Sequence, residues 1–375
     1  MDFEFSDEQR LLKDSVERLI ADRYGFESRK TYLASATGWS TDVWAQYAEL
    51  GLLGLPFADE YGGFGGGPVE TMIVMEAFGR GLVLEPYFAT VILGGGVLRH
   101  AASAAQRSAL LPLVGAGKLK LALAHVERHS RYDLAHVTTN ARRDGDGWVI
   151  NGTKSVVLHG DCADKIFVSA RISGGSRDRG GIGIFLVNAA AVTRQGYLMQ
   201  DGLRAAEISF VNAPAEAVGD PEAGLALLER VTDEALAALA AESIGIMTEM
   251  HELTVEYLKT RQQFGRPIGQ FQVLQHRSVD MFVALEQARS ITLYATMMAS
   301  DDNAQERARA MAATKTQVGK SGRHIGQECV QLHGGIGMTA EYKAGHYFKR
   351  MTMIDKMYGD ADFHLAALAR MGGIF

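Results

Sequence analysis

Cysteine is scarce in this chain, and that scarcity excludes two common ways of stabilising a small domain. Only Cys162 and Cys329 are present, and their separation matches neither a disulfide framework nor a zinc-binding motif. The histidines offer no metal site either, because they do not share one face at metal-ligand spacing: His125, His129, His159 and His333. We therefore expect no metal ion, and a reducing, cytoplasmic location fits.

Long apolar runs, basic runs and a secretory signal are missing as well. The most apolar stretch, Pro86 to Leu98, holds about 13 residues with three glycines, whereas a spanning helix needs roughly 20 apolar residues. We predict a buried helix there and no membrane span. The N-terminal MDFEFSDEQR is acidic, unlike a signal peptide. A net charge of -6 without a Lys- or Arg-rich run argues against a nucleic-acid surface.

What remains is the composition of an ordinary globular protein. The 375 residues are 47% hydrophobic and 22% charged, which suffices for one large core or two to three smaller ones. The hydrophobic period divides the chain into a helical part (1–119), a strand-rich part (120–221) and a second helical part (222–375). We predict that these parts are domains.

Helical signals dominate the first part. Ser6 followed by Gln9 makes a capping box, so the first helix is expected to begin near Ser6. Trp39–Leu53 and Val69–Val83 repeat the helical period. The glycine-rich segment Glu60–Gly67 between them is predicted to be a loop.

The middle part changes to short runs bounded by Gly, Asp and Asn, a pattern typical of strands. Turns are expected at 144–147 and 173–181. The predicted strands are Trp148–Asn151, Ile166–Ile172 and Gly183–Val187. Helical spacing returns at Ala223, with breaks expected at 266–269 and 334–337, and favours a helical bundle.

The segment RQQFGRPIGQFQ, from Arg261 to Gln272, places a permanent cation beside an aromatic ring at a helix end. Arg261 and Phe264 there offer a grip for the pyrophosphate and adenine of a dinucleotide. The alternative for an isolated Arg-x-x-Phe is an arginine paired with a carboxylate and a phenylalanine in the core.

The segment QLHGGIGMTAEY, from Gln331 to Tyr342, is the second candidate for binding a cofactor. Gly334 and Gly335 would let the backbone approach a ligand closely, and Gln331 offers both a donor and an acceptor. Taken alone, a Gly-Gly pair is more often a helix cap or a turn.

Together these two segments resemble the C-terminal signatures of the acyl-CoA dehydrogenases. The likeness spans essentially the whole chain, because it includes EYGGFGGG at Glu60, NGTK at Asn151 and FVNAPAEAVG from Phe210 to Gly219. It implies an α+β fold with an N-terminal helical domain, a middle β domain and a C-terminal four-helix bundle, with NGTK at Asn151 forming a turn. It also implies FAD as cofactor, with Arg261, Phe264, Gln272, Gln331, Gly334 and Gly335 reaching a neighbouring subunit's FAD.

The catalytic glutamate of that family is missing. Where the family has Tyr-Glu-Gly-Thr, this chain has Tyr358, Gly359, Asp360 and Ala361. Dehydrogenation of an acyl-CoA needs a carboxylate to remove a proton beside the thioester carbonyl, and glycine has none. Asp360 is displaced by one position and is a weak fallback.

Some members of the family carry the base on the first long helix of the bundle. Counting back from Arg261, that position is Ala235, followed by Leu236 where the family usually has arginine. Glu234 is one residue off, a turn of about 100° on a helix. We interpret Glu234 as an ion-paired or solvated side chain and only as a second fallback base.

The segments that would face the chain's own flavin also depart from the family. Thr-Glu-Pro is replaced by Val126, Glu127 and Arg128, and the flavin-packing Trp-Ile-Thr is replaced by Val156, Val157 and Leu158. Ordinary divergence with another flavin cradle is the alternative. The family's residues are lost where they would face the chain's own flavin and retained where they would face a neighbouring subunit's FAD. This asymmetry points to a heteromer.

The leading hypothesis is a small, non-catalytic subunit of a heterotetramer with a related catalytic subunit, most like the small subunit of pimeloyl-CoA dehydrogenase. That resemblance implies acyl-CoA as substrate, degradation of fatty or dicarboxylic acids, and an electron-transfer flavoprotein as acceptor. Two alternatives remain: a self-sufficient homotetramer with a relocated base, and a scaffold that binds no flavin. A subsidiary hypothesis is that His364 and Asp362 fill the vacated acyl cavity.

Overall fold

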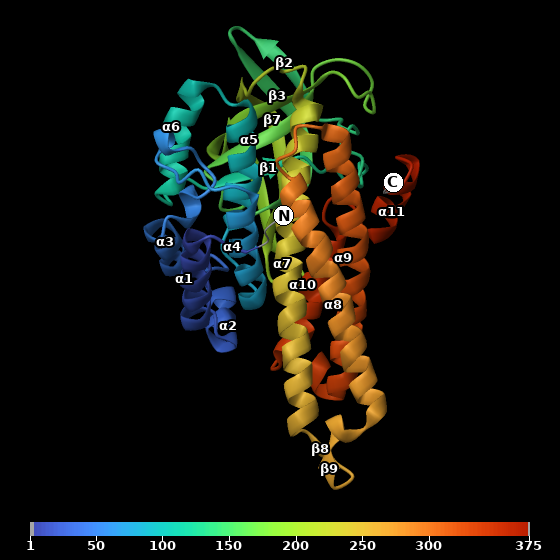
Figure 1. Cartoon of the computed structure of the whole chain (residues 1–375). Helices are drawn as coiled ribbons and strands as arrows, with labels where there is room; N and C mark the ends of the chain where they lie inside the picture. Colours follow the sequence, from blue (N-terminus) through green and yellow to red (C-terminus); the bar gives the residue numbers. More distant parts are fainter. Residues whose placement is uncertain (1–3, 374–375) are drawn as a thin grey trace. The chain divides into compact units, whose positions relative to one another are not determined.

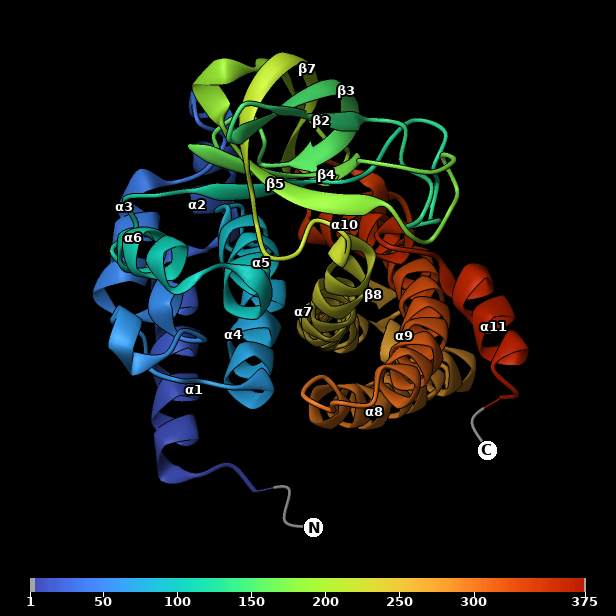
Figure 2. The same cartoon turned by 90° about the horizontal axis from the view of Figure 1, so that it is seen from above.

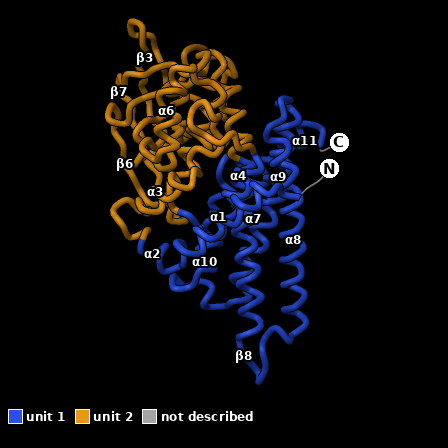
Figure 3. Tube along the Cα trace, turned by 60° about the vertical axis from the view of Figure 1, so that its left-hand side comes forward, with its two compact units in different colours: residues 1–31, 68–83, 236–375 blue, residues 32–67, 84–235 orange. Residues whose placement is uncertain are grey.

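The computed structural model describes residues 4–373. Residues 1–3 of the expected N-terminal domain and 374–375 of the expected C-terminal domain lie outside the described residues. The chain forms two compact units that interleave along the sequence (Figure 3). The first unit comprises residues 1–31, 68–83 and 236–375, and the second comprises 32–67 and 84–235.

The first helix, α1 (Asp7–Arg23), begins where the capping box predicts. The Ser6 hydroxyl accepts a hydrogen bond from the Gln9 backbone N–H at 3.2 Å, and the Gln9 side chain accepts from the Ser6 N–H at 3.0 Å. Buried Val16, Leu19 and Ile20 recur at helical spacing and form the inner face.

The expected helix over Trp39–Leu53 is shorter than predicted. It is α3 (Thr41–Glu49), which starts after Ser40 because the Ser40 hydroxyl accepts from the Val43 N–H at 3.2 Å. Gly51, with φ +75°, then turns the chain into a short 3-10 helix. The other helices of the first 119 residues are α2 (Phe26–Ala34), α4 (Pro68–Gly81), α5 (Gly95–Ala101) and α6 (Ala104–Gly115).

The apolar stretch predicted to be a buried helix is helical and buried, but its first half is a π-helix, Phe88–Gly94, that continues into α5. Close packing explains its glycines. A Cβ at Gly94 would lie 2.5 Å from the Leu121 Cβ, and one at Gly95 would lie 2.8 Å from the Phe57 ring. Among residues 4–373, no helix is long and apolar enough to cross a membrane.

The strands of the middle part form one seven-stranded sheet (Figure 2). Strand β4 pairs with β2 and β5, and the path β2-β3-β7-β5 completes a ring, so the sheet closes on itself as a barrel. Its interior holds apolar side chains, among them Ile150, Val157, Ile166, Phe185 and Ile208. The strands are β1 (Leu121–Ala124), β2 (Asn140–Asp144), β3 (Gly147–Leu158), β4 (Lys165–Arg171), β5 (Ile182–Asn188), β6 (Thr193–Leu198) and β7 (Arg204–Ala217).

The predicted NGTK turn at Asn151 is wrong. Strand β3 runs straight through it, and a register shift between Ile150 and Gly152 accommodates the extra length as a bulge. Gly152 has φ +147°, and a Cβ there would come within 2.8 Å of three Thr139 atoms. The expected turns at 144–147 and 173–181 are confirmed as connections between strands.

The last part is helical, as expected. Its long helices α7, α8 and α9 run side by side, and the hairpin of β8 and β9 lies at one end of them (Figure 1). The hairpin replaces the helix at the predicted break 266–269, and a 3-10 helix, Gly334–Met338, stands at the other. The elements are α7 (Gly224–Thr260), β8 (Gln262–Gln263), β9 (Arg266–Pro267), α8 (Gln272–Met298), α9 (Ala304–His333), α10 (Lys343–Lys356) and α11 (Ala361–Arg370).

Helices α4 and α7 approach so closely that their backbones touch. A Cβ at Gly79 would lie 2.0 Å from the Glu242 carbonyl oxygen, and one at Gly245 would lie 1.9 Å from the Glu76 carbonyl oxygen. Only glycine fits at both positions. This contact joins α4 to the C-terminal helices within the first compact unit.

Candidate functional site

The hairpin after α7 presents the first candidate segment to solvent. Arg261 is exposed directly after the helix, and its N–H bonds to the Tyr257 carbonyl oxygen at 2.9 Å. Phe264, at the hairpin tip with φ +54°, is 90% exposed. The structure therefore excludes a core role for Phe264, and among residues 4–373 it gives Arg261 no ion pair.

The second segment lies where α9 ends. Gly334 caps the helix with φ +65°, a backbone conformation that favours glycine. A Cβ added at Gly334 or Gly335 would meet no atom within 4 Å, so the backbone there faces open space. Gln331 is exposed on the last turn of α9, and Gln272 is exposed at the first position of α8. This is the open backbone that a close cofactor contact requires.

His333 brings the two segments together. Its ring centroid lies 4.5 Å from that of Tyr257, four residues before Arg261, and it directly precedes Gly334. Because Tyr257 belongs to α7 and His333 to α9, the two candidate segments emerge at the same end of these helices. Sequence spacing excludes His333 only as a metal ligand and gives no sign of this contact.

The turn between α10 and α11 holds Gly359 in a backbone conformation that residues with a side chain rarely adopt. Gly359 has φ +112°, and a Cβ there would lie 2.5 Å from the Phe363 ring and 2.6 Å from the His364 Nε2. His364 Nε2 donates to the Tyr358 carbonyl oxygen at 2.9 Å. Burial lowers the pKa of His364 to about 4, so the ring is neutral near pH 7.

Two buried side chains, Lys315 and Asp355, hold the chain on either side of that turn. Lys315 Nζ donates to the carbonyl oxygens of Ile354 and of Asp355, the latter at 3.1 Å, and the Asp355 carboxylate accepts from the Ala361 N–H at 3.3 Å. Burial lowers the pKa of Lys315 to about 7. A turn tied on both sides has little freedom to move away from an added side chain.

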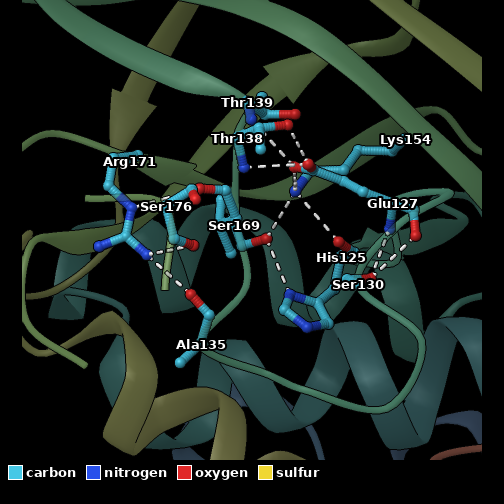
Figure 4. Close-up of polar contacts among 11 residues, drawn as sticks. His125, Glu127, Ser130, Ala135, Thr138, Thr139, Lys154, Ser169, Arg171 and Ser176 are labelled. Atoms are coloured by element: carbon cyan, nitrogen blue, oxygen red, sulfur yellow. Dashed lines mark hydrogen bonds and ion pairs between the residues drawn. The ribbon is translucent and has the colours of Figure 1, made fainter. Parts of the chain in front are cut away.

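In the middle part, a buried polar network surrounds Lys154 (Figure 4). Lys154 Nζ donates to Glu127 Oε1 at 2.7 Å, to Ser169 Oγ at 3.0 Å and to the His125 carbonyl oxygen at 3.0 Å. The Glu127 carboxylate also accepts from the backbone N–H groups of Thr138 and Thr139. All three protons of the ammonium have acceptors, so the buried charge is fully satisfied.

Comparison with known proteins identifies the family. Three family models match in succession: acyl-CoA dehydrogenase, N-terminal domain, over residues 6–118; the middle domain over 122–213; and the C-terminal domain over 222–372. The chain belongs to the acyl-CoA dehydrogenase family. Solved structures of this fold hold FAD, and the cofactor and the fold expected from the sequence are confirmed.

Individual relatives match almost end to end. The probable acyl-CoA dehydrogenase YngJ of Bacillus subtilis is 26% identical over 381 residues, with 99% of each chain covered. A variant of the Tcur3481-Tcur3483 steroid ACAD is 28% identical, with a TM-score of 0.88 and 97% of each chain covered. The ChsE4-ChsE5 complex from Mycobacterium tuberculosis shares the fold at 22% identity, with a TM-score of 0.87 and coverage of 99% and 98%.

Neither fallback base is free to act as one in this acyl-CoA dehydrogenase chain. Glu234 accepts from Arg99 at 2.6 Å and His100 at 2.7 Å. Burial alone raises the pKa of Glu234, but the hydrogen bond from His100 and the charge of Arg99 outweigh it and hold that pKa at about 2. Asp360 caps α11, and its bond from the Phe363 N–H lowers its pKa. Carboxylates held in this way are weak proton acceptors.

Three residues lie at the positions where the resemblance predicts flavin contacts. Val157 is 1% exposed in the barrel core, Leu158 is half-buried, and Val156 is 43% exposed with φ +51° at a register shift. The Glu207 carboxylate lies beside Val156, accepting from Ser155 Oγ at 2.8 Å and Tyr197 Oη at 3.3 Å. Aliphatic side chains, Val156 and Leu158, stand where the resemblance to the acyl-CoA dehydrogenases implies an indole and a hydroxyl.

Replacing Lys154 with methionine is expected to lower the free energy of unfolding by about 3–5 kcal/mol, because it leaves the Glu127 carboxylate buried without its cation. Urea unfolding at pH 7 measures this loss. Lys165→Met, which removes an exposed hydrogen bond to Asn188 in the same sheet, is the control and should change stability by no more than about 0.5 kcal/mol. Equal losses of unfolding free energy in the two variants would contradict a stabilising role for the buried Lys154–Glu127 ion pair.

The same network makes stability depend on pH. Burial raises the pKa of Glu127, but the charge and hydrogen bond of Lys154 outweigh burial and bring the pKa to about 2, below its ordinary 4.5. The unfolded chain then binds more protons between these values, so this stabilisation is present above pH 4.5 and is lost as the pH falls toward 2. In the Lys154→Met variant, the free energy of unfolding should therefore fall less steeply as the pH drops from 4.5 toward 2.

Proposed function

We propose that this chain is a subunit of an FAD-dependent acyl-CoA dehydrogenase that desaturates a CoA thioester between its α and β carbons. It contributes Arg261, Phe264, Gln331, Gly334 and Gly335, with Gln272 beside them, to FAD bound mainly by a related catalytic subunit. The observation that carries this proposal is the turn at Gly359, where a strained backbone and the neighbouring rings disfavour a side chain at the position of the family's base.

The chemistry requires a base that this chain does not supply. A carboxylate must remove the α-proton while bound FAD accepts the β-hydride, and hydrogen bonds must stabilise the charge on the thioester carbonyl. Gly359 offers a backbone N–H for that carbonyl but no carboxylate. Glu234 and Asp360 already bind cations and backbone groups. The partner subunit therefore supplies the glutamate.

The retained contacts suit a cofactor held by a neighbour. Arg261 and Phe264 are exposed, and the backbone at Gly334 and Gly335 faces open space, so a ligand reaches them without displacing protein atoms. A cation and an aromatic face suit pyrophosphate and adenine. The flavin-facing positions fit less well, because Val156 lacks an indole and the Glu207 carboxylate lies beside it.

An exposed apolar face on α8 supports assembly with another chain. Val279, Phe282 and Val283 are each about half exposed or more, at 57%, 49% and 48%. Such a patch on a helix is typical of a protein interface. We propose a heterotetramer of two catalytic and two small subunits in the cytoplasm, by analogy with the family's paired enzymes, of which the ChsE4-ChsE5 complex is a named assembly.

An acyl-CoA is the proposed substrate, with fatty or dicarboxylic acid degradation as the pathway class and an electron-transfer flavoprotein as acceptor. These assignments rest on the family and on the likeness to pimeloyl-CoA dehydrogenase small subunits. The His364 ring lies where a Cβ at Gly359 would point, which supports a role for His364 in the vacated acyl site, whereas Asp362 is exposed on α11. Unchanged partner activity after His364→Ala and Asp362→Ala would count against that role.

Flavin content tests the proposed function directly. The chain is purified alone and after co-expression with a family member that carries the glutamate, and the absorbance of FAD per chain is recorded. We expect a colourless chain alone and about one FAD per pair in the complex. A stoichiometric yellow homomer that oxidises acyl-CoA unaided would indicate a homotetramer with a relocated base. A colourless complex would indicate a scaffold.

A further inference from the structure

His333 is a buried histidine whose two ring nitrogens have different partners. It is 3% exposed, with Nδ1 2.7 Å from the Cys329 carbonyl oxygen and Nε2 3.2 Å from Tyr342 Oη. Because a carbonyl oxygen only accepts, Nδ1 carries the proton, and Nε2 accepts from the Tyr342 hydroxyl. Burial lowers the pKa of His333 and outweighs the opposing effect of its hydrogen bonds to the backbone of Cys329 and of Leu253, so the neutral form is favoured.

The ring also packs between two aromatic side chains from different segments. Its centroid lies 4.5 Å from that of Tyr257 on α7 and 5.1 Å from that of Tyr342, just before α10. A single side chain at the end of α9 thus contacts α7 and the segment that leads into α10.

Each of these contacts is one step from a proposed FAD contact. The Tyr257 carbonyl oxygen accepts from the Arg261 N–H at 2.9 Å, and His333 is bonded through the backbone to Gly334. Gly334 and Gly335 have no side chains of their own to hold them, and glycine loses more conformational entropy on ordering than any other residue. Their position therefore depends on what anchors His333.

We propose that His333 is a positioning residue for FAD. In its neutral form, with the proton on Nδ1, it fixes the backbone of Gln331–Gly335 relative to the hairpin that carries Arg261, so that both segments bind the same cofactor. This inference rests on the proposed function. It adds a residue that touches no part of the cofactor itself.

The test uses the assembled complex and measures FAD dissociation by the rise in flavin fluorescence. Tyr342→Phe removes only the hydroxyl that Nε2 accepts from, and we expect FAD affinity to fall roughly 2- to 10-fold. His333→Asn keeps a donor for the Cys329 carbonyl but removes the ring and Nε2, and we expect a fall of roughly 10- to 100-fold. Near-UV circular dichroism and thermal unfolding report whether the fold is intact.

Three outcomes decide the matter. Faster FAD release from Tyr342→Phe, with an unchanged unfolding temperature, supports positioning, since one hydroxyl has been removed and the fold retained. Wild-type FAD release in both variants, while Arg261→Ala loses FAD, overturns this inference and leaves the proposed function standing. Wild-type FAD release in Arg261→Ala as well means that the proposed function itself has failed.

Discussion

Arg261→Ala in the assembled enzyme is expected to weaken FAD binding roughly 10- to 100-fold. A hydrogen bond to a charged group contributes about 1.5–3 kcal/mol, and about 1.4 kcal/mol corresponds to a factor of ten in affinity. The effect should be this large because Arg261 forms no ion pair within residues 4–373, so its charge is available to the pyrophosphate. Equilibrium titration of the apo-complex with FAD, followed by flavin fluorescence, gives the ratio of dissociation constants.

A matched surface arginine separates this effect from a change in net charge. Arg10 is exposed on α1, where it pairs with Asp7 at 2.9 Å, and Arg10→Ala should bind FAD as tightly as the wild type. Phe264→Ala tests the aromatic half of the grip without altering charge. If Arg261→Ala retains wild-type affinity while the complex stays intact, the hairpin does not hold the pyrophosphate.

Restoring glutamate at position 359 should fail to create an active enzyme, and this is the second large effect that the structure predicts. Gly359→Glu places a Cβ 2.5 Å from the Phe363 ring in a backbone conformation with φ +112°. Backbone strain of this kind costs about 1–3 kcal/mol, and forcing neighbours aside costs about 1–3 kcal/mol more. We expect lower stability and no acyl-CoA oxidation by the chain alone, measured by denaturant unfolding and a dye-coupled assay.

Two further variants separate strain from chemistry. Gly359→Ala carries the strain without the carboxylate and should lose nearly as much stability. Gly180→Ala, at an exposed glycine with no atom within 4 Å of its added Cβ, should change stability by no more than about 0.5 kcal/mol. Turnover by the Gly359→Glu chain alone would show that only the missing carboxylate keeps this subunit inactive.

Local signals carried much of the fold. The capping box at Ser6 placed the start of α1 because both of its hydrogen bonds lie within one turn of chain. Strands β4 and β5 were near their predicted positions for the same reason, since their apolar runs end at Gly- and Asp-rich turns. The NGTK prediction failed because the bulge at Gly152 is decided by the contact with Thr139, 13 residues earlier in the chain.

The motifs point to Arg261 and Gly334 as cofactor contacts, and that role stays a prediction. Their arrangement could not be predicted, because no spacing rule brings Tyr257 on α7 against His333 on α9. Likewise, the missing glutamate at Gly359 was evident from the sequence, whereas the positive φ and the closeness of His364 were not. Strand β7 was missed because Pro214 and alternating small residues obscure its period.

The glycine contact between α4 and α7 bears on how this gene can change by recombination. The family's N-terminal domain, matched over residues 6–118, includes Gly79, whereas Gly245 lies in the C-terminal domain. Exchange of either domain with a homologue that has alanine at one of these positions would drive a methyl group into the facing backbone. A recombinant chain therefore packs α4 against α7 only if it receives glycine at both positions. The two domains, although separate in sequence, must change together at this contact.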